Sequence, residues 1–457
     1  MNRIKNLTIC CAVALLAGAS AASAYVQYPY DIDNVPQCWT NWVALGAGVC
    51  PTGQARGAED VDWNNDGIFD APGVLPNGRP AATYMHLSAG DGMAKMADGT
   101  DMYIFSFSNL TGIREADKMT AGSFKAEISA PTIDISEGQA FYLTLSNVGM
   151  VLRPDLFDPH TVHFHGYPNA SSVFDGEPMA SFGIRMMQDL TYFYQPYGPV
   201  YQAFPAQCVD PGTAGTYMYH CHVEATEHME MGMLGNNIIR PSQDGTNVTY
   251  AGDGKTYSKF AFNDCLSATD PLCGSSGYDV EKAIQFTAFD PVFHQADLDA
   301  QPPPFSTIAA TYFLFNGRGY PDTISPVPIT NSEGYAAQKL DAKVTATSGQ
   351  TILLRLTNLS VKDFATIEAP GLTFNVVGMC ARQLRNPGPD GFYGTADDQD
   401  LSYVANSVMI GPGESFDVVI RTSGVPTGTY HLISRNLDQL NNNGVERGGA
   451  MTEIEIQ

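Results

Sequence analysis

Short runs rich in Val, Ile, Thr, Tyr and Phe recur along this 457-residue chain, each bounded by Gly, Pro, Asn or Asp. No long amphipathic helical pattern accompanies them, so the chain is predicted to be all-β and to fold into sandwiches. The runs form two similar arrays, one from APTIDISEGQAFYLTLSNV to GTAGTYMYHCHVEATEHMEMGMLGNNIIRP and one from DAKVTATSGQTILLRLTNLS to GAMTEIEIQ. We therefore expect two copies of one β-sandwich, over residues 103–245 and 255–457.

The first 24 residues, MNRIKNLTICCAVALLAGASAASA, place Arg3 and Lys5 before an apolar run that ends in Ala22-Ser23-Ala24. This layout is typical of a secretory signal peptide. The apolar run is too short for a convincing membrane span. We therefore expect cleavage after Ala24 and a periplasmic or secreted protein.

Acidic residues dominate the charge, with 48 Asp and Glu against 24 Lys and Arg and a formal net charge of −24. Such a charge repels nucleic acid and anionic membranes, so we expect neither as a partner. It favours cationic or metal-ion partners, although solubility in a saline or periplasmic medium explains it equally well.

Two of the nine cysteines lie in the signal segment, which leaves an odd number for an oxidising compartment. An odd count implies that one thiol has another role, and we assign that role to Cys221. Loop closure favours pairs that are close in sequence. The expected disulfides are Cys38–Cys50, Cys265–Cys273 and, by elimination, Cys208–Cys380.

Residues 25–102 are rich in Pro, Gly and Asp and predict an irregular N-terminal region, either a covering arm or an elaborated first strand pair. Within it, DVDWNNDGIFD resembles the first part of a calcium-binding loop, with Gly67 at the sharp turn but no closing Glu. Calcium and a plain acidic turn are equally supported. The oxygen side chains of this loop are Asp60, Asp62, Asn64, Asp66 and Asp70. A second acidic loop, 386–400, is expected to be a solvated turn.

A thiolate, two imidazoles and a distant thioether form the ligand set of a blue-copper site, because this set suits both oxidation states of copper. The segment HCHVEATEHMEMGM supplies Cys221, His228 and, five residues later, Met233. His160 lies upstream, on the strand pair expected to pack against this hairpin. Each residue alone is usually part of a core or a surface. However, six of the nine histidines fall in two short segments, one of which holds Cys221, so we predict a copper site.

Successive side chains of a β-strand point to opposite faces. Cys221 should therefore point to one face, while His220 and His222 point to the other. The remaining histidines, His86, His294 and His431, are isolated and are expected to lie in the core or at the surface.

These two histidine-containing segments resemble motifs of a known family. HTVHFHG is similar to the His-X-His-Gly motif of the first domain of multicopper oxidases, and GTYMYHCH to that domain's His-X-His hairpin with cysteine in the middle. The likeness covers about 120–457 and implies two cupredoxin-like Greek-key domains with type 1 copper in the first, as in two-domain laccases and copper nitrite reductases. It also implies a type 2 copper at His163 and type 3 coppers at His165, His220 and His222.

The second array departs from this family. A complete trinuclear cluster uses eight histidines, four from each of two domains, whereas only four stand at matching positions here. Aligning GTY at 215–217 with GTY at 428–430 puts Ile433, Ser434 and Arg435 opposite the His-Cys-His of the first array. Arg435 also replaces the histidine that would complete a nitrite reductase, so nitrite reduction is disfavoured. We expect a homo-oligomer or a partner chain to complete the copper site.

The leading hypothesis is an exported copper-dependent oxidoreductase of the multicopper oxidase type. It would take single electrons at the type 1 copper and pass them, through Cys221 with His220 and His222, to a type 2/3 site that reduces dioxygen. The donor is a low-valent metal ion or a small organic molecule. Side chains that suit a metal ion are Asp175, Glu177, Glu224, Glu227, Glu230, Met179, Met186 and Met187. The alternatives are an electron-transfer or copper-storage protein with an incomplete cluster, and a structural protein with vestigial copper.

Overall fold

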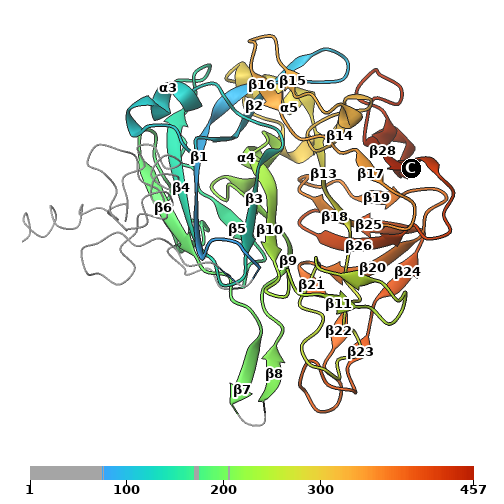
Figure 1. Cartoon of the computed structure of the whole chain (residues 1–457). Coiled ribbons are helices and arrows are strands. Elements are labelled where there is room, and N and C mark those ends of the chain that lie inside the picture. The colour runs from blue at the N-terminus through green and yellow to red at the C-terminus, as the bar shows by residue number, and fades with distance from the viewer. Residues whose placement is uncertain (1–74, 76, 169–173, 204–205) are drawn as a thin grey trace, which may run out of the picture. The chain divides into compact units, whose positions relative to one another are not determined.

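The computed structural model describes residue 75 and residues 77–168, 174–203 and 206–457 (Figure 1). Three expectations fall outside the described residues and stay predictions: the signal peptide at 1–24, the disulfide Cys38–Cys50, and the calcium loop with Asp62, Asn64, Asp66 and Asp70. Within the described part of the chain, no helix is long and apolar enough to cross a membrane.

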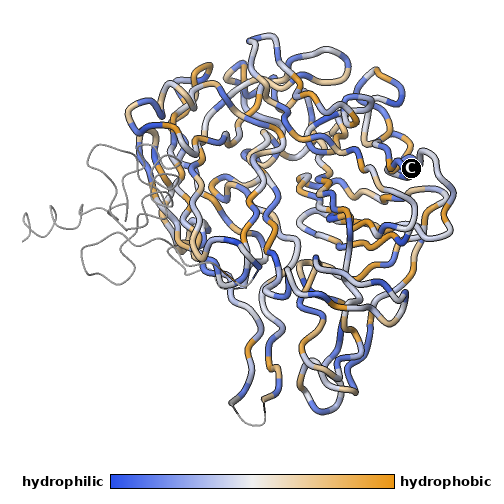
Figure 2. Tube along the Cα trace, viewed as in Figure 1, coloured by the Kyte–Doolittle hydropathy of each residue, from blue (hydrophilic) through white to orange (hydrophobic). Residues whose placement is uncertain are grey.

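The first sandwich consists of two four-stranded sheets whose buried side chains meet in one core. Figure 2, in the same view as Figure 1, shows hydrophobic residues in orange along the paths of many strands. One sheet has the order β2 (Asp101–Asn109), β1 (Ala82–Lys95), β4 (Ala140–Gly149) and β6 (Asp189–Tyr194). The other has the order β3 (Ala130–Ser136), β10 (Leu234–Arg240), β9 (Gly215–His220) and β5 (His163–His165).

The second sandwich repeats this strand order. Its first sheet contains β14 (Tyr312–Phe315), β13 (Val280–Phe289), β18 (Thr351–Asn358), β26 (Ser415–Arg421), β20 (Phe374–Met379) and β21 (Arg382–Gln383), with β24 (Tyr403–Ala405) beside β20. Its second sheet contains β17 (Val344–Ala346), β28 (Met451–Ile456), β27 (Gly428–Ser434), β19 (Ala365–Glu368) and β25 (Ser407–Ile410). β13 runs parallel to β18 as β1 runs parallel to β4, and β28 parallel to β17 as β10 to β3. The predicted duplication of one all-β sandwich is therefore confirmed.

The first sandwich starts at Ala82, before the expected boundary at 103, because β1 and β2 form a strand pair within it. The N-terminal region was expected to be either a covering arm or an elaborated first strand pair. From Ala82 onward it is a strand pair. The sequence of β1, ATYMHLSAGDGMAK, lacks the Val and Ile that mark strands, because its buried positions accept small residues. At Gly90, for example, a Cβ would lie 2.9 Å from Cγ2 of Val148.

Short elements decorate the two sandwiches. Among the described residues, the α-helices are α3 (Lys118–Gly122), α4 (Ala225–Glu230) and α5 (Pro291–Leu298). The two-stranded pairs are β7 (Val200–Ala203) with β8 (Ala206–Asp210), β11 (Val248–Thr249) with β12 (Thr256–Tyr257), β15 (Ile329–Thr330) with β16 (Ala336–Gln338), and β22 (Arg385–Asn386) with β23 (Gln399–Asp400).

Of the two expected disulfides that fall within the described residues, Cys265–Cys273 is confirmed and Cys208–Cys380 is wrong. Cys265 and Cys273 form a disulfide bond. Cys208 and Cys380 are both free, so their proposed pairing is wrong. Cys208 is buried on β8, where its thiol donates to the main-chain oxygen of Asp210 at 3.2 Å, while Cys380 is exposed. Elimination gave this pair without any information on where the two side chains point.

Both sandwiches belong to one compact unit, and β9 is buried on both of its faces. One face packs into the first core through Tyr217 and Tyr219. On the other face, Thr216 donates a 2.5 Å hydrogen bond to Asp417 of β26, and Met218 clusters with Leu359. This second face of β9 therefore lies against the second sandwich of the same chain.

Candidate metal centre

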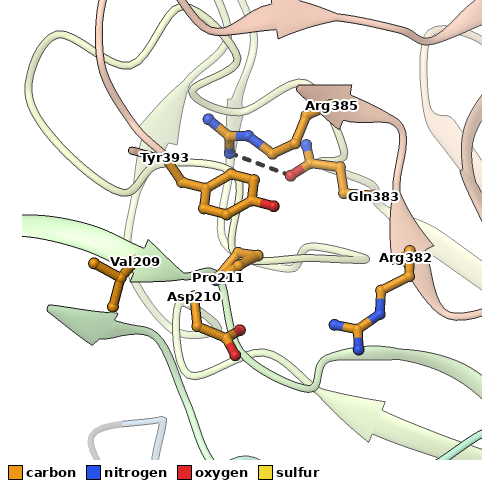
Figure 3. Close-up of a pocket in the computed structure, with 7 residues that line it drawn as sticks. All are labelled: Val209, Asp210, Pro211, Arg382, Gln383, Arg385 and Tyr393. Atoms are coloured by element: carbon orange, nitrogen blue, oxygen red, sulfur yellow. Dashed lines mark hydrogen bonds between the residues drawn. The ribbon is translucent and has the colours of Figure 1, made fainter. Parts of the chain in front are cut away.

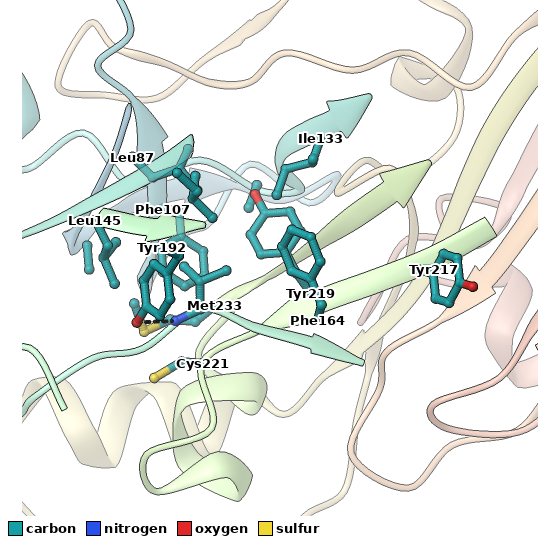
Figure 4. Close-up of a cluster of buried hydrophobic side chains, with 14 of the residues drawn as sticks. Leu87, Phe107, Ile133, Leu145, Phe164, Tyr192, Tyr217, Tyr219, Cys221 and Met233 are labelled. Atoms are coloured by element: carbon teal, nitrogen blue, oxygen red, sulfur yellow. Dashed lines mark hydrogen bonds between the residues drawn. The ribbon is translucent and has the colours of Figure 1, made fainter. Parts of the chain in front are cut away.

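Cys221 follows the last residue of β9, His220, and its side chain turns into the core of the first sandwich. Alternation along the strand puts it on the same side as Tyr217 and Tyr219. Met233 belongs to the same core, as Figure 4 shows. The main-chain N–H of Cys221 donates to the oxygen of Met233 at 3.1 Å. The thiol and the thioether are thus brought together by the pairing that closes the hairpin.

Two imidazoles meet Cys221 in this core. Sγ of Cys221 lies 3.2 Å from Nδ1 of His228 and 3.9 Å from Nδ1 of His160. All three side chains are at most 1% exposed. Their ligand atoms lie within 4.8 Å of one another, and the N–H of Thr161 points at Sγ from 3.4 Å. One thiol, two imidazoles and the adjacent Met233 form the donor set that suits copper.

The pKa values of the two imidazoles are shifted in opposite directions. Burial lowers the pKa of His160 well below its ordinary value, and the facing His228 adds to this effect. At His228 burial acts in the same direction, but Cys221 and Asp158 outweigh it and raise the pKa to about 10. Binding of a metal ion at these groups therefore competes with a proton on His228.

A second cluster forms on the opposite face of β9. His163 of β5 lies directly across from His220 in the strand register. Nδ1 of His165 is 3.2 Å from Nε2 of His220, and the ligand atoms of these three histidines lie within 4.8 Å of one another. The ring of His222 is centred 4.8 Å from that of His163, at the half-buried edge of the cluster. The structure thus gathers all four histidines that the sequence assigned to type 2 and type 3 copper.

The protonation of this cluster favours metal binding. Burial lowers the pKa of His220 to about 3. Burial also lowers the pKa of His165, and the neighbouring His163 and His222 add to the effect. Neutral imidazole is the form that ligates a metal ion. The cluster therefore fits copper without displacing protons from these two rings at neutral pH.

Asp158 is a further acidic residue at this site that no sequence pattern predicted. Its Oδ2 atom lies 3.9 Å from Nε2 of His228, and with Glu224 these residues form a third group able to hold a metal ion. Both Oδ2 of Asp158 and Nε2 of His228 are buried without a hydrogen-bond partner among the described residues. No motif marks Asp158, and its place two residues before His160 was the one available signal.

The other candidate donor residues are dispersed. Asp175 contacts His163, where its main-chain oxygen accepts from Nδ1 at 2.9 Å. Glu230 is buried and accepts from the N–H of Asp290 at 2.6 Å. Met179 is 94% exposed and Met187 70% exposed. Of the predicted acidic residues, Glu224 and Glu227 thus remain as the ones near His228.

The register of the second sandwich shows what replaced the ligands there. Glu368 of β19 pairs with Ile433 of β27, as His163 pairs with His220. Arg435, two residues beyond Ile433, forms an ion pair with Glu368 at 3.3 Å. An ion pair therefore lies where the first sandwich carries imidazoles.

The isolated histidines also lie where expected. His86 contacts Oγ of Ser146 at 2.7 Å, His294 donates to the oxygen of Tyr103 at 2.5 Å, and His431 is exposed. The acidic loop 386–400 contributes to none of the groups able to hold a metal ion within the described part of the chain.

A pocket of about 380 Å³ lies between the end of β8 and the segment from β21 to β22 (Figure 3). Its lining consists of Val209, Asp210, Pro211, Arg382, Gln383, Arg385 and Tyr393. Arg385 is already paired with Asp270 and Asp398. The lining contains neither histidine nor cysteine, so the pocket offers none of the side chains that the two clusters use.

Two family models described as multicopper oxidase match the chain, one over residues 105–243 and one over residues 292–452. Together they cover more than half of its 457 residues. The chain belongs to the multicopper oxidase family. This multicopper oxidase is accordingly a copper-dependent oxidase, and copper is its cofactor, as predicted.

Solved structures share the fold of this multicopper oxidase. The blue copper oxidase from Nitrosomonas europaea is 20% identical, with a TM-score of 0.53 over 82% of this chain and 86% of its own. The multicopper oxidase mgLAC is 17% identical, with a TM-score of 0.53 over the same shares, 82% and 86%. Another multicopper oxidase is 16% identical, with a TM-score of 0.50 over 85% of this chain and 93% of its own. No curated protein matches the chain.

Proposed function

We propose that this multicopper oxidase is exported and oxidises a low-valent metal ion, such as ferrous ion, with dioxygen as the electron acceptor. In this proposal the type 1 copper is held by His160, Cys221, His228 and Met233. Copper of type 2 or type 3 character is held by His163, His165, His220 and His222. When bound, copper supplies one-electron redox chemistry at both places.

One observation carries the proposal: a two-residue segment is shared between the two sites. Cys221 lies in the buried group with His160 and His228, while the preceding residue, His220, lies in the histidine cluster. Nδ1 of His220 also donates to the main-chain oxygen of Cys221 at 2.9 Å. A covalent link and a hydrogen bond thus connect a site that can accept electrons with a site that can pass them on.

The donor enters, in this proposal, at the edge of His228 that faces away from Cys221. There Asp158 and Glu224 group with Nε2 of His228. Glu227 adds a third carboxyl, whose pKa is raised to about 7 by burial and by neighbouring acidic residues. Carboxylates suit hard divalent cations. These side chains bind and orient the cation beside the ring through which its electron leaves.

The variant Asp158→Asn tests the metal-ion site. It should lower kcat/KM for ferrous ion by roughly tenfold, since the loss of about 1.4 kcal/mol of binding changes affinity tenfold. Oxidation of an uncharged phenol should change less than twofold. The control is Asp438→Asn, because Asp438 is an exposed acid of the second sandwich. An equal loss for both donors in Asp158→Asn would contradict the metal-ion site.

Export rests on the signal-like segment 1–24 and on the acidic charge of −24. Protein recovered from the periplasm or the culture medium should begin directly after Ala24 when its N-terminus is sequenced. Intact residues 1–24 on the recovered protein would contradict cleavage.

Assembly is also part of the proposal. His163 and His222 are only half-buried, so the histidine cluster presents an edge to solvent. A homo-oligomer that covers this edge would protect bound copper. Sedimentation velocity should therefore find a closed oligomer at micromolar concentration, and a strictly monomeric protein would contradict this part.

A further inference from the structure

Two histidines of the second cluster each use one ring nitrogen for a hydrogen bond to the main chain. Nδ1 of His163 donates to the main-chain oxygen of Asp175 at 2.9 Å, and Nδ1 of His220 donates to that of Cys221 at 2.9 Å. Carbonyl oxygens only accept, so in both rings Nε2 is free to act as a ligand. Histidines that ligate metals commonly donate their other N–H to the main chain in this way.

His165 is held by the second sandwich of its own chain. Its ring lies beside Gly413, in the loop between β25 and β26. A Cβ on Gly413 would lie 3.0 Å from Nε2 of His165, so this ring edge rests against the loop. The N–H of Gly413 donates to the oxygen of the buried Asn358 at 2.8 Å, which anchors the loop. Nδ1 of His165 is then the nitrogen left to face the cluster.

The cluster is also closed along β9. Thr216 and Met218, which share a face of this strand with His220, contact Asp417 and Leu359 of the second sandwich. His220 is the next residue on that face and is only 3% exposed. The nitrogens of the cluster therefore converge where the two sandwiches of one chain meet.

The number of ligands fits one ion and not three. Two nitrogens that bind one ion at about 2.0–2.1 Å lie no more than about 4 Å apart, and the pair from His165 and His220 is 3.2 Å apart. The equivalent positions of the second sandwich hold Glu368 and Arg435, which neutralise each other. Among the described residues, no histidine or cysteine of the second sandwich joins the group.

We propose that His163, His165 and His220 hold a single copper ion within one chain, closed by Gly413 of the chain's own second sandwich. Each chain then binds two coppers, one here and one at Cys221. The inference rests on the proposed function in taking copper as the ion. It differs from the family's three-copper cluster, which needs eight histidines, whereas this site gathers four.

Copper counting on the oxidised, copper-loaded full chain tests the proposal. Elemental analysis should give two coppers per chain, and electron paramagnetic resonance should detect both in equal amounts. Cys221→Ser should lose the blue absorption and keep one copper. Three or more coppers per chain, with part of them silent in the resonance because they are coupled in pairs, would overturn the proposal. Loss of the second copper upon dilution of oligomers to monomers would overturn it as well.

Gly413→Ala tests the closure by the second sandwich. Its Cβ would press on His165, so the second copper should bind roughly 10–100-fold more weakly, the range typical for lost support of a ligand. The blue absorption should stay unchanged. Gly424→Ala is the matched control, because Gly424 has φ +78 against +79 at Gly413 and nothing within 4 Å of a built Cβ. Equal copper binding in both variants would overturn the closure. Absence of blue copper from the wild-type protein would instead contradict the proposed function.

Discussion

Met233 is fixed by its main chain more than by its side chain. Its N–H donates to the oxygen of His228 at 2.8 Å, and its own oxygen accepts from Cys221 at 3.1 Å. The residue is fully buried. The side chain at this position therefore stays beside the thiol of Cys221 whichever apolar residue occupies it, so the axial ligand can be changed without moving the other ligands.

Met233→Leu should accordingly fold, because volume-conserving swaps usually cost less than about 1.5 kcal/mol. The protein should stay blue, and its reduction potential should rise by tens of millivolts, because a weaker axial donor stabilises the oxidised ion less. For a one-electron couple, a tenfold change in the equilibrium constant of reduction corresponds to about 59 mV. Redox titration of the blue absorption measures the shift. Met179→Leu, at a 94% exposed position, should leave the potential unchanged. An unchanged potential in Met233→Leu would remove Met233 from the site.

At the scale of elements, most of the candidate site that could be predicted from the sequence lies on or next to strands β5 and β9. Strict alternation in GTYMYHCH places Cys221 on the core face and His220 on the opposite face, and this follows without knowledge of the rest of the fold. Asp158 and Gly413 could not be found in this way. They lie in loops that reach the histidines only after distant strands have paired, and an acid or a glycine in a loop has no local signature. Strand β1 was also missed, because its small residues lack the Val and Ile that mark strands.

The loop that contains Gly176 offers a test at this scale. Gly176 has φ +77, and a Cβ there would lie 2.1 Å from the oxygen of Val162. Gly176→Ala should therefore lower the free energy of unfolding by more than about 1 kcal/mol. It should also weaken copper binding at His163, whose ring contacts Asp175 next to this glycine. Gly254→Ala, with φ +72 and open space around a Cβ, is the control for backbone strain. Equal urea midpoints for the two variants would show that the loop adjusts freely.

At the scale of the whole molecule, a buried charged network links the two sandwiches. Arg355 of β18 is fully buried and lies 3.2 Å from Asp417 of β26 and 3.0 Å from the hydroxyl of Thr216 of β9. It also pairs with Glu281 of β13. Strand β9, which carries His220 of the histidine cluster, is thus bonded to the second sandwich by buried charged groups. Removing one partner of such a group strongly destabilises a protein.

Arg355→Met should destabilise the protein by roughly 3–5 kcal/mol, since it leaves the buried carboxylate of Asp417 without its cation, while Glu281 keeps its ion pair with Arg240. Thr216→Val removes the hydroxyl that donates to Asp417 and accepts from Arg355 but leaves their ion pair in place, so it should cost about 1.5–3 kcal/mol, the range for a hydrogen bond to a charged group. Urea unfolding followed by fluorescence measures both values. The link between the sandwiches would be refuted if Arg355→Met were no more destabilising than Thr216→Val.

The central claim is that Cys221 binds copper together with His160 and His228, and visible absorption of the copper-loaded protein tests it most directly. The wild-type protein should be intensely blue from charge transfer between thiolate and copper. Cys380→Ser, which removes the exposed free cysteine, should be equally blue. Cys221→Ser should be colourless while its far-ultraviolet circular dichroism stays that of the wild type. A blue colour that survives in Cys221→Ser, or a wild-type protein that takes up copper and stays colourless, would contradict the assignment.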